Sequence, residues 1–296
     1  TPHPPVPLAG GTVYPVNGAE NPPMSFASLA SATNYLNAHG VSGTGEVILE
    51  LGSGYSEPAW PVQFPAISGL SSTLRLVVRP AAGSTAMTSV PGTSWGRYAI
   101  GLNGASYVTL DGRAGGVGPG GDWTIRCTGS GTGGFGESAV RLDCGPNAMT
   151  GVVVRNCVLE AEAANGTSGI LAVTGSGSYA LTNVSFAENV IRSTGSGSTS
   201  CRGWGIWLAD ATNGGNSGWT VRDNKISQFA YGGIGLTASA SGVNVYGNEL
   251  FHASAVTQPA ATQFSGIYFS TYYMAGSQIY SNFIHDIQLV GAATAV

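Results

Sequence analysis

Two short sequence elements alternate along this chain from residue 138 to residue 284, and this repeat constrains the fold more than any other feature. Copies of the first element, G-I-x-L, are YAIGL 98–102, SAVRL 138–142, SGILA 168–172, WGIWL 204–208, GGIGL 232–236 and SGIYF 265–269, with VILEL 47–51 as the expected first copy. Copies of the second, V-x-V-x-x-N-x-I, are VVVRNCVL 152–159, VSFAENVI 184–191, WTVRDNKI 219–226, VNVYGNEL 243–250 and SQIYSNFI 277–284. The alternation of apolar residues in each copy predicts a short strand with one buried face.

The segments between these strands are rich in Gly, Ser and Asn and differ in length, as loops do. Regular strands joined by irregular loops predict a coil that adds one layer per repeat, stacked through parallel backbone ladders. The expected fold is therefore all-β. We expect about seven coils, which begin near residues 47, 99, 139, 169, 205, 233 and 266.

One position of the second element is nearly always asparagine. The residues at this position are Cys157, Asn189, Asn224, Asn248 and Asn282. Asparagine tolerates left-handed turn conformations, and its amide can donate to the carbonyl of the next coil and accept from the previous coil. We therefore interpret these residues as a structural turn ladder and not as ligands.

The repeat and the asparagine positions resemble the right-handed parallel β-helix superfamily, which has the pectate-lyase-like fold. The resemblance covers roughly residues 25–287 and extends to secreted bacterial β-helix modules in which phrases such as YVTLDG recur. It implies a right-handed parallel β-helix with a short capping helix at its N-terminal end and stacked asparagines at a tight turn.

The chain is expected to divide into an arm and a β-helix domain. Residues 1–24 are rich in Pro and Gly and should be extended, and residues 25–296 should form the domain. A rough helical stripe predicts the capping helix at 26–38, with Ser25 as its N-cap and Gly40 after its end. The segment 112–121 should protrude as a loop.

Composition limits the classes of partner and the location. The chain has 296 residues, 43% of them hydrophobic, so it can bury a core. A net charge of −4 without a basic run argues against nucleic acid, and no apolar stretch reaches a membrane span. The start TPHPPVPL has no signal-peptide pattern, as in a secreted protein whose signal has been removed. A single lysine and a surface of Ser, Thr, Asn and Gly suit an extracellular or cell-surface protein.

Cysteines and histidines do not predict a metal site or a cofactor. None of Cys127, Cys144, Cys157 and Cys201 has CxxC spacing, and the four histidines lack paired-ligand spacing. Buried thiols and one disulfide of unassigned pairing both remain possible interpretations.

Enzymes of the resembling superfamily place their sites on the outer face of a sheet. By parity, the outward row of the first element is Gly101, Arg141, Leu171, Trp207, Gly235 and Tyr268. This row has no carboxylate, whereas glycosidases need two and calcium needs several oxygen donors. Lys225 with Asp223, and Glu160 with Glu162, are interpreted as surface charges. No catalytic residue is predicted, and the sequence favours a protein that is not an enzyme.

The outward rows instead suggest binding. Exposed apolar, aromatic and arginine side chains suit protein interfaces and the faces of sugar rings. The candidates for binding a partner or a carbohydrate are Arg141, Leu171, Trp207, Tyr268, Tyr272 and Tyr273. A second outward row holds Arg155, Ala187, Arg222, Tyr246 and Tyr280.

The C-terminal sequence QLVGAATAV has no helix pattern, charge or proline, which predicts a strand without a partner. We therefore expect a non-catalytic, secreted or cell-surface structural or adhesive protein, as in the subunit of an extracellular filament. Subunits of this homo-oligomer or filament would meet through residues 285–296 and the arm at 1–24. The alternatives are a polysaccharide lyase or glycoside hydrolase, and a carbohydrate-binding β-helix module.

Overall fold

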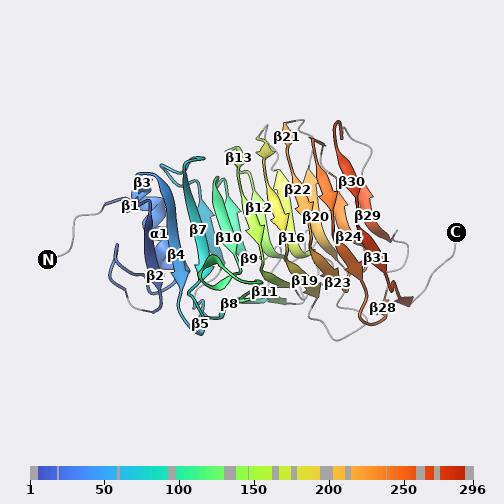
Figure 1. Ribbon diagram of the computed structural model, residues 1–296, viewed down its shortest axis with the longest axis horizontal. Coiled ribbons are helices and arrows are strands. Elements are labelled where there is room, and N and C mark those ends of the chain that lie inside the picture. Colours follow the sequence, from blue (N-terminus) through green and yellow to red (C-terminus); the bar gives the residue numbers. More distant parts are fainter. Residues whose placement is uncertain are drawn as a thin grey trace.

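Parallel strands in stacked sheets make up most of the molecule (Figure 1). The computed structural model describes residues 6–18, 20–58, 61–92, 98–129, 138–145, 147–161, 167–174, 179–193, 203–210, 215–237, 239–257, 264–269 and 274–290. Within these residues the chain visits three long sheets in turn and then returns to the first, so each circuit adds one layer. This arrangement is solenoid-like and compatible with a parallel β-helix.

The long sheets are named here by their strand counts in the described part of the chain. The nine-stranded sheet holds β2 (Thr12–Val16), β4 (Gly45–Leu51), β7 (Leu74–Pro80), β10 (Val108–Asp111), β14 (Val153–Arg155), β18 (Ser185–Ala187), β22 (Thr220–Arg222), β26 (Asn244–Tyr246) and β30 (Gln278–Tyr280). The eight-stranded sheet holds β5 (Tyr55–Ser56), β8 (Ala86–Gly92), β11 (Trp123–Gly129), β15 (Val158–Ala161), β19 (Val190–Ser193), β23 (Lys225–Ser227), β27 (Glu249–Phe251) and β31 (Phe283–His285). The seven-stranded sheet holds β6 (Val62–Pro65), β9 (Tyr98–Asn103), β12 (Ser138–Asp143), β16 (Thr167–Thr174), β20 (Trp204–Asp210), β24 (Gly232–Leu236) and β29 (Ser265–Phe269).

Three smaller sheets lie at corners and ends. Four two-residue strands pair between successive coils: β13 (Met149–Thr150), β17 (Leu181–Thr182), β21 (Asn216–Ser217) and β25 (Ala240–Ser241). β1 (Leu8–Ala9) pairs with β3 (Val41–Ser42), and β28 (Val256–Thr257) pairs with β32 (Leu289–Val290).

Copies of the first sequence element from residue 98 onward lie in the seven-stranded sheet, and copies of the second contribute β14, β18, β22, β26 and β30. The assignment of VILEL 47–51 to the first element is wrong. This segment lies in β4, which pairs with β7 in the nine-stranded sheet. Both elements share the same apolar alternation, so a copy without glycine or asparagine does not reveal its sheet. Val62–Pro65 instead starts the seven-stranded sheet and pairs with β9.

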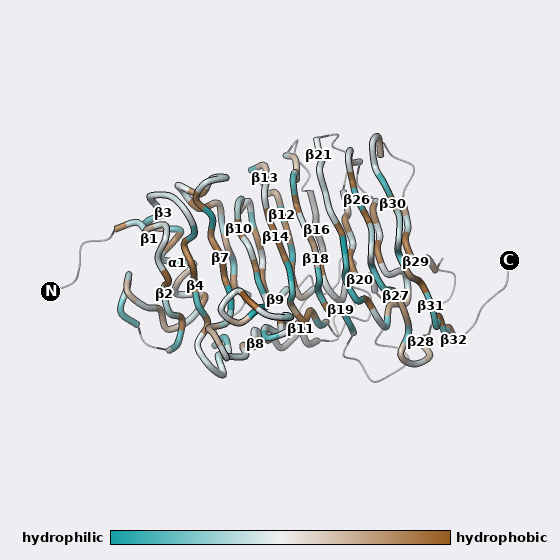
Figure 2. Tube along the Cα trace, viewed as in Figure 1, coloured by the Kyte–Doolittle hydropathy of each residue, from teal (hydrophilic) through white to brown (hydrophobic). Residues whose placement is uncertain are grey.

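The inward side chains form continuous columns along the stack. In the nine-stranded sheet one column runs through Val78, Leu110, Val154, Phe186, Val221 and Val245, and in the eight-stranded sheet another runs through Ile125, Leu159, Ile191, Ile226 and Leu250. All of these side chains are fully buried. Figure 2 shows that hydrophobic and hydrophilic residues alternate along the strands. Burial of such columns is the main favourable contribution to folding.

The glycine of G-I-x-L faces the interior, where side chains of the eight-stranded sheet occupy the space that a Cβ atom would need. A Cβ on Gly205 would lie 2.3 Å from Cγ2 of Ile226, and a Cβ on Gly233 would lie 2.2 Å from Cδ2 of Leu250. Gly169 and Gly266 face isoleucines in the same way. The repeat therefore alternates a missing side chain in one sheet with a large one in the other, as dense packing requires.

The helix begins later than predicted. α1 spans Leu29–His39, and Ser28, not Ser25, is its N-cap, because the Ser28 and Ser31 side chains form a reciprocal capping box. Gly40 follows the helix with a φ of 67°, and Leu29, Ala32 and Leu36 are buried. α1 lies at the same end of the stack as β2 and contacts β6 (Figure 1).

The segment at 1–24 is not a separate extended arm. β1 pairs with β3, and β2 pairs with β4 as the first strand of the nine-stranded sheet. Leu8, Tyr14 and Val16 are buried, so this Pro- and Gly-rich segment belongs to the fold from residue 8 onward. Residues 1–5 lie outside the described residues.

Candidate functional site

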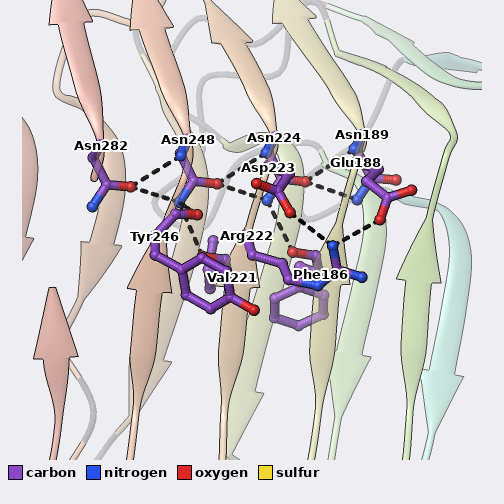
Figure 3. Close-up of polar contacts among 10 residues, drawn as sticks. All are labelled: Phe186, Glu188, Asn189, Val221, Arg222, Asp223, Asn224, Tyr246, Asn248 and Asn282. Atoms are coloured by element: carbon purple, nitrogen blue, oxygen red, sulfur yellow. Dashed lines mark hydrogen bonds and ion pairs between the residues drawn. The ribbon is translucent and has the colours of Figure 1, made fainter. Parts of the chain in front are cut away.

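The asparagine positions form a hydrogen-bonded row across neighbouring coils (Figure 3). The Nδ2 group of Asn189 donates to Oδ1 of Asn224 at 3.0 Å, Asn224 donates to Asn248 at 2.9 Å, and Asn248 donates to Asn282 at 2.8 Å. The backbone N–H of each donor residue bonds the same Oδ1 at 3.1 Å. Asn189, Asn224 and Asn248 are buried, so these side chains satisfy turn groups that water does not reach.

The direction of one contact differs from the expectation. Each Nδ2 also donates to a backbone carbonyl at 2.9 Å, but that carbonyl belongs to the previous coil and not to the next one. Asn224, for example, donates to the carbonyl of Phe186. In every one of these turns the residue before the row position has the positive φ, and the asparagine itself does not take the left-handed conformation. These preceding residues are Asn156, Glu188, Asp223, Gly247 and Ser281.

Cys157 ends this asparagine row on the N-terminal side. Its backbone N–H donates to Oδ1 of Asn189 at 3.1 Å, as an asparagine would. Its Sγ lies 3.9 Å from the carbonyl oxygen of Leu110 and donates to that of Arg155 at 3.2 Å. Burial raises the pKa of this thiol, which makes it a poor nucleophile. One layer earlier Gly112 leaves no room for a side chain, because its Cβ would meet the Asn156 carbonyl at 2.0 Å.

Ion pairs cover the outer face of the nine-stranded sheet. Arg79 pairs with Glu50 at 3.2 Å, and the buried Asp111 accepts from Arg113 and Arg155, each at 2.8 Å. Burial alone would raise the pKa of Asp111, but the hydrogen bonds from Arg113 and the charge of Arg155 hold it below its ordinary value. This part of the face is therefore held by paired charges.

The interpretation of Glu160 as a surface charge is wrong. Glu160 is buried, with 1% of its side chain exposed, and it accepts from Arg126 on one neighbouring strand and from Arg192 on the other. The Glu160–Arg192 contact is 2.6 Å. Glu160 is thus the centre of a cross-strand ion triad, and its expected neighbour Glu162 lies outside the described residues.

Lys225 pairs with a different acid than the sequence suggested. Its Nζ lies 3.2 Å from Glu249 on the next strand and 5.1 Å from the centre of the Phe251 ring, whereas Asp223 pairs with Arg222 at 2.7 Å. His285 also contacts Glu249, at 3.1 Å. The hydrogen bond between His285 and Asp286 is the main cause of the raised pKa of the His285 imidazole. Lys225 is 53% exposed, which is typical of a surface ion pair.

The predicted partner-binding row on the seven-stranded sheet is in register. Gly101, Arg141, Leu171, Trp207, Gly235 and Tyr268 are consecutive pairing partners across five strand pairs. Arg141, Trp207 and Tyr268 are half-buried. The side chain of Leu171 and all of Tyr272 and Tyr273 lie outside the described part of the structure.

Aromatic rings outside the predicted row cover its glycines. A Cβ on Gly101 would lie 2.4 Å from the Tyr98 ring, and one on Gly235 would lie 2.7 Å from the Trp204 ring. Trp204 also contacts the ring of Tyr268, with centroids 5.9 Å apart. Tyr98 and Trp204 are absent from the predicted row because parity alone does not show which side chains pack over its glycines. The sequence does hold a signal for each ring. Tyr98 stands three residues before Gly101 in the same strand, and Trp204 pairs with Gly232, three residues before Gly235 in the next strand.

Arg141 is held on this face by two contacts. Its guanidinium lies 5.7 Å from the centre of the Tyr98 ring, and its Nη2 donates to Asp143 at 3.1 Å. The Tyr98 hydroxyl in turn accepts from Gln63 at 2.8 Å. Trp207 donates through Nε1 to Thr237 at 3.1 Å. Arginine and aromatic rings thus lie together on one outer surface of the seven-stranded sheet.

The C-terminal end of the stack exposes residues that belong to core columns. Ile279 continues the column of Val245 but is 50% exposed, and Ile284 continues the column of Leu250 but is 45% exposed. Phe283 and Tyr280 beside them are 62% and 48% exposed. β29, β30 and β31 are the last strands of their sheets. This end therefore combines apolar side chains with strand edges. The prediction of a C-terminal strand without a partner is wrong for Leu289–Val290, which form β32 and pair with β28, and residues 291–296 lie outside the described ranges.

Among the described residues, no three His, Cys, Asp or Glu side chains are grouped so that they could hold a metal ion. Cys127, Cys144 and Cys157 are buried, and Cys201 lies outside the described residues. Within the same residues, no helix has the length and apolar character needed to cross a membrane.

Comparison with protein-family models, curated proteins and solved structures finds no match to this chain.

Proposed function

We propose that this chain is a right-handed parallel β-helix of the pectate-lyase-like superfamily and serves as a secreted or cell-surface structural or adhesive module. In this proposal α1 is the N-terminal cap and about seven coils form the rod of an extracellular assembly, as in a filament subunit. The layered order of the sheets and the asparagine row support the fold assignment. The scarcity of lysine in the sequence supports an extracellular location.

The apolar side chains of the last described layer carry the proposal of a structural role. β29, β30 and β31 are the last described strands of their sheets, and Ile279, Phe283 and Ile284 in this layer are 45–62% exposed. Unpaired edges with apolar side chains favour the addition of further strands from another polypeptide. A module with such an apolar layer is suited to contacts along its axis.

The test is whether the purified chain associates with itself or with a surface. We expect light scattering after size exclusion to show a mass that rises with concentration, and negative-stain images to show end-to-end particles. Deletion of residues 1–5 tests the arm, because deletion of 1–24 would also remove β1 and β2 from their sheets. A chain that stays monomeric at every concentration and is not retained on insoluble polysaccharides would contradict the proposal.

Carbohydrate binding on the seven-stranded sheet is the second candidate. The Trp204 ring lies against Gly232 and Gly235 and contacts Tyr268, so aromatic surface follows the sheet. Flat aromatic rings are suited to pack against sugar rings. Glycan binding that is lost in Trp204→Ala but kept in Tyr246→Ala, which changes the nine-stranded sheet, would support this candidate. Release of unsaturated or reducing ends from a polysaccharide would instead favour a lyase or hydrolase.

A further inference from the structure

We propose that Tyr246 and Tyr280 form a site of oxidative cross-linking, at which a carbon–carbon bond joins their two phenol rings. The bond would tie β26 to β30 on the outer face of the nine-stranded sheet. It lies within one molecule, so this inference goes beyond the proposed function and needs no partner chain.

The two rings are stacked face to face. Tyr246 and Tyr280 are direct pairing partners in the parallel ladder of β26 and β30, and their ring centroids lie 4.9 Å apart with 6° between the ring planes. Because Val245 beside Tyr246 points into the core, both tyrosine rings lie on the outer face of the sheet. The strand pairing therefore holds the carbons beside the two hydroxyl groups close together on a surface that faces outward.

The asparagine row fixes the backbone at both tyrosines. Nδ2 of Asn248 donates to the carbonyl oxygen of Tyr246, and Nδ2 of Asn282 donates to that of Tyr280, each at 3.1 Å. Asn248 also donates to Asn282 at 2.8 Å. Figure 3 shows Tyr246 beside this row. These bonds keep the two strands, and with them the two rings, in one register.

The hydroxyl groups of this pair are not needed to hold the stack. Within the described residues, the phenol oxygens of Tyr246 and Tyr280 form no hydrogen bond. By contrast, the hydroxyls of Tyr14, Tyr55 and Tyr98 each bond a neighbouring group. Stacking needs only the rings. The hydroxyls therefore give this position a phenol chemistry that the fold does not require.

No other two tyrosine rings in the described part of the chain are in contact. Tyr268 lies against Trp204, with centroids 5.9 Å apart, and Tyr98 lies beside an arginine. A radical formed on either of these rings has no second phenol in contact with it. A radical on Tyr246 or Tyr280 has one at stacking distance, so this pair should couple in preference to the others.

The coupling requires a one-electron oxidant, here a haem peroxidase supplied with hydrogen peroxide. Each phenol loses one electron and its hydroxyl proton, and the two radicals form a bond between the ring carbons beside their oxygens. The hydrogen on each coupled carbon then moves through solvent to the phenol oxygen, which restores both aromatic rings. In total the pair loses two hydrogen atoms, and one hydrogen peroxide is reduced to two water molecules.

Peptide mapping after oxidation of dilute, monomeric protein tests the site. In residues 188–296 the glutamates are Glu188 and Glu249, so cleavage after glutamate places Tyr246 in peptide 189–249 and Tyr280 in peptide 250–296. We expect these two peptides to appear joined, with a mass two hydrogen atoms below their sum. Fragment ions should place the bond at the two tyrosines, and the fluorescence of dityrosine should rise with the joined product.

Tyr280→Phe tests the chemistry without removing the ring. The stack and the thermal midpoint should be unchanged, whereas the joined peptides should disappear because phenylalanine forms no phenoxyl radical. Tyr179→Phe is the matched control and should keep the full yield, because Tyr179 is 39% exposed but lies outside the pair. Oxidation of the unfolded chain in denaturant tests the geometry, and the yield of this link should fall about tenfold or more once the rings are no longer held together.

The outcomes are separate from those that test the proposed function. A bond between Tyr246 and Tyr280 that is lost in Tyr280→Phe and in denaturant supports the site. A link between peptides 189–249 and 250–296 that survives in Tyr280→Phe, or an equal yield in denaturant, overturns it, as does a product that joins two molecules in place of one. None of these results depends on whether the chain associates with itself or binds a surface.

Discussion

Asn224 shows how much one side chain contributes to a stacked turn. It accepts two hydrogen bonds from Asn189 and donates to Phe186 and Asn248, all in a buried site. Asn224→Ala leaves several buried groups without partners, each costing about 1–3 kcal/mol, so we expect a loss of about 3 kcal/mol or more in the free energy of unfolding. Chemical denaturation measures this loss. Asn244→Ala, which removes one long contact on the outer face, should cost much less, and equal losses would contradict a special role for the row.

Asp111 makes the stability of the folded protein depend on pH. Its pKa is held below the ordinary value by Arg113 and Arg155 despite its burial. A lowered folded-state pKa stabilises the fold above the pKa of the unfolded chain, and this contribution is lost as the pH falls through the folded value, below about pH 4. Asp111→Asn should therefore lower the thermal midpoint more at pH 7 than at pH 3. Asp143→Asn, whose ion pair is partly exposed, should change little at either pH, and a pH-independent effect of Asp111→Asn would contradict the linkage.

At the scale of elements, the glycine column determines how closely two sheets approach. A Cβ on Gly205 would lie 2.3 Å from Ile226 and 2.7 Å from the carbonyl oxygen of Gly233. Gly205→Ala should therefore destabilise the protein by about 1–3 kcal/mol through overpacking. Combining Gly205→Ala with Ile226→Ala removes the clash with the Ile226 side chain but keeps the clash with the Gly233 carbonyl oxygen. The double variant should therefore be less stable than Ile226→Ala alone. Full recovery of that stability by the double variant would show that the sheets can separate.

The strands could be predicted wherever glycine or asparagine identified the sheet. Copies with these residues, such as 204–208 and 219–226, lie where their pattern placed them. The segments 47–51 and 62–65 lack the markers, and their sheets became clear only from pairing. Local alternation also carries no information about cross-strand partners, which is why the sequence indicates a surface charge at Glu160 and does not indicate the role of Trp204.

For the whole molecule, the two ends differ more than the sequence suggested. At one end α1 and the first strands bury Phe26 and Leu29, and at the other end Ile279 and Phe283 are exposed. In a stack where each layer contacts only its neighbours, stability depends on the layers on either side. Among the described coils, the coil of β29, β30 and β31 has a neighbouring layer on one side, so it should open more often than the coils with layers on both sides.

Hydrogen exchange measures this difference along the stack. In dilute, monomeric protein we expect the amides of β29, β30 and β31 to exchange fastest among the strands, and those of β14 and β18 to exchange slowest, because opening the interior requires neighbouring layers to open. The first strands should be protected to an intermediate degree by α1. Phe283→Glu changes a side chain that is 62% exposed and should therefore keep this gradient in the monomer. Uniform exchange in all coils of the monomer would show that the molecule opens as one unit and that its C-terminal layer is as stable as the covered ones.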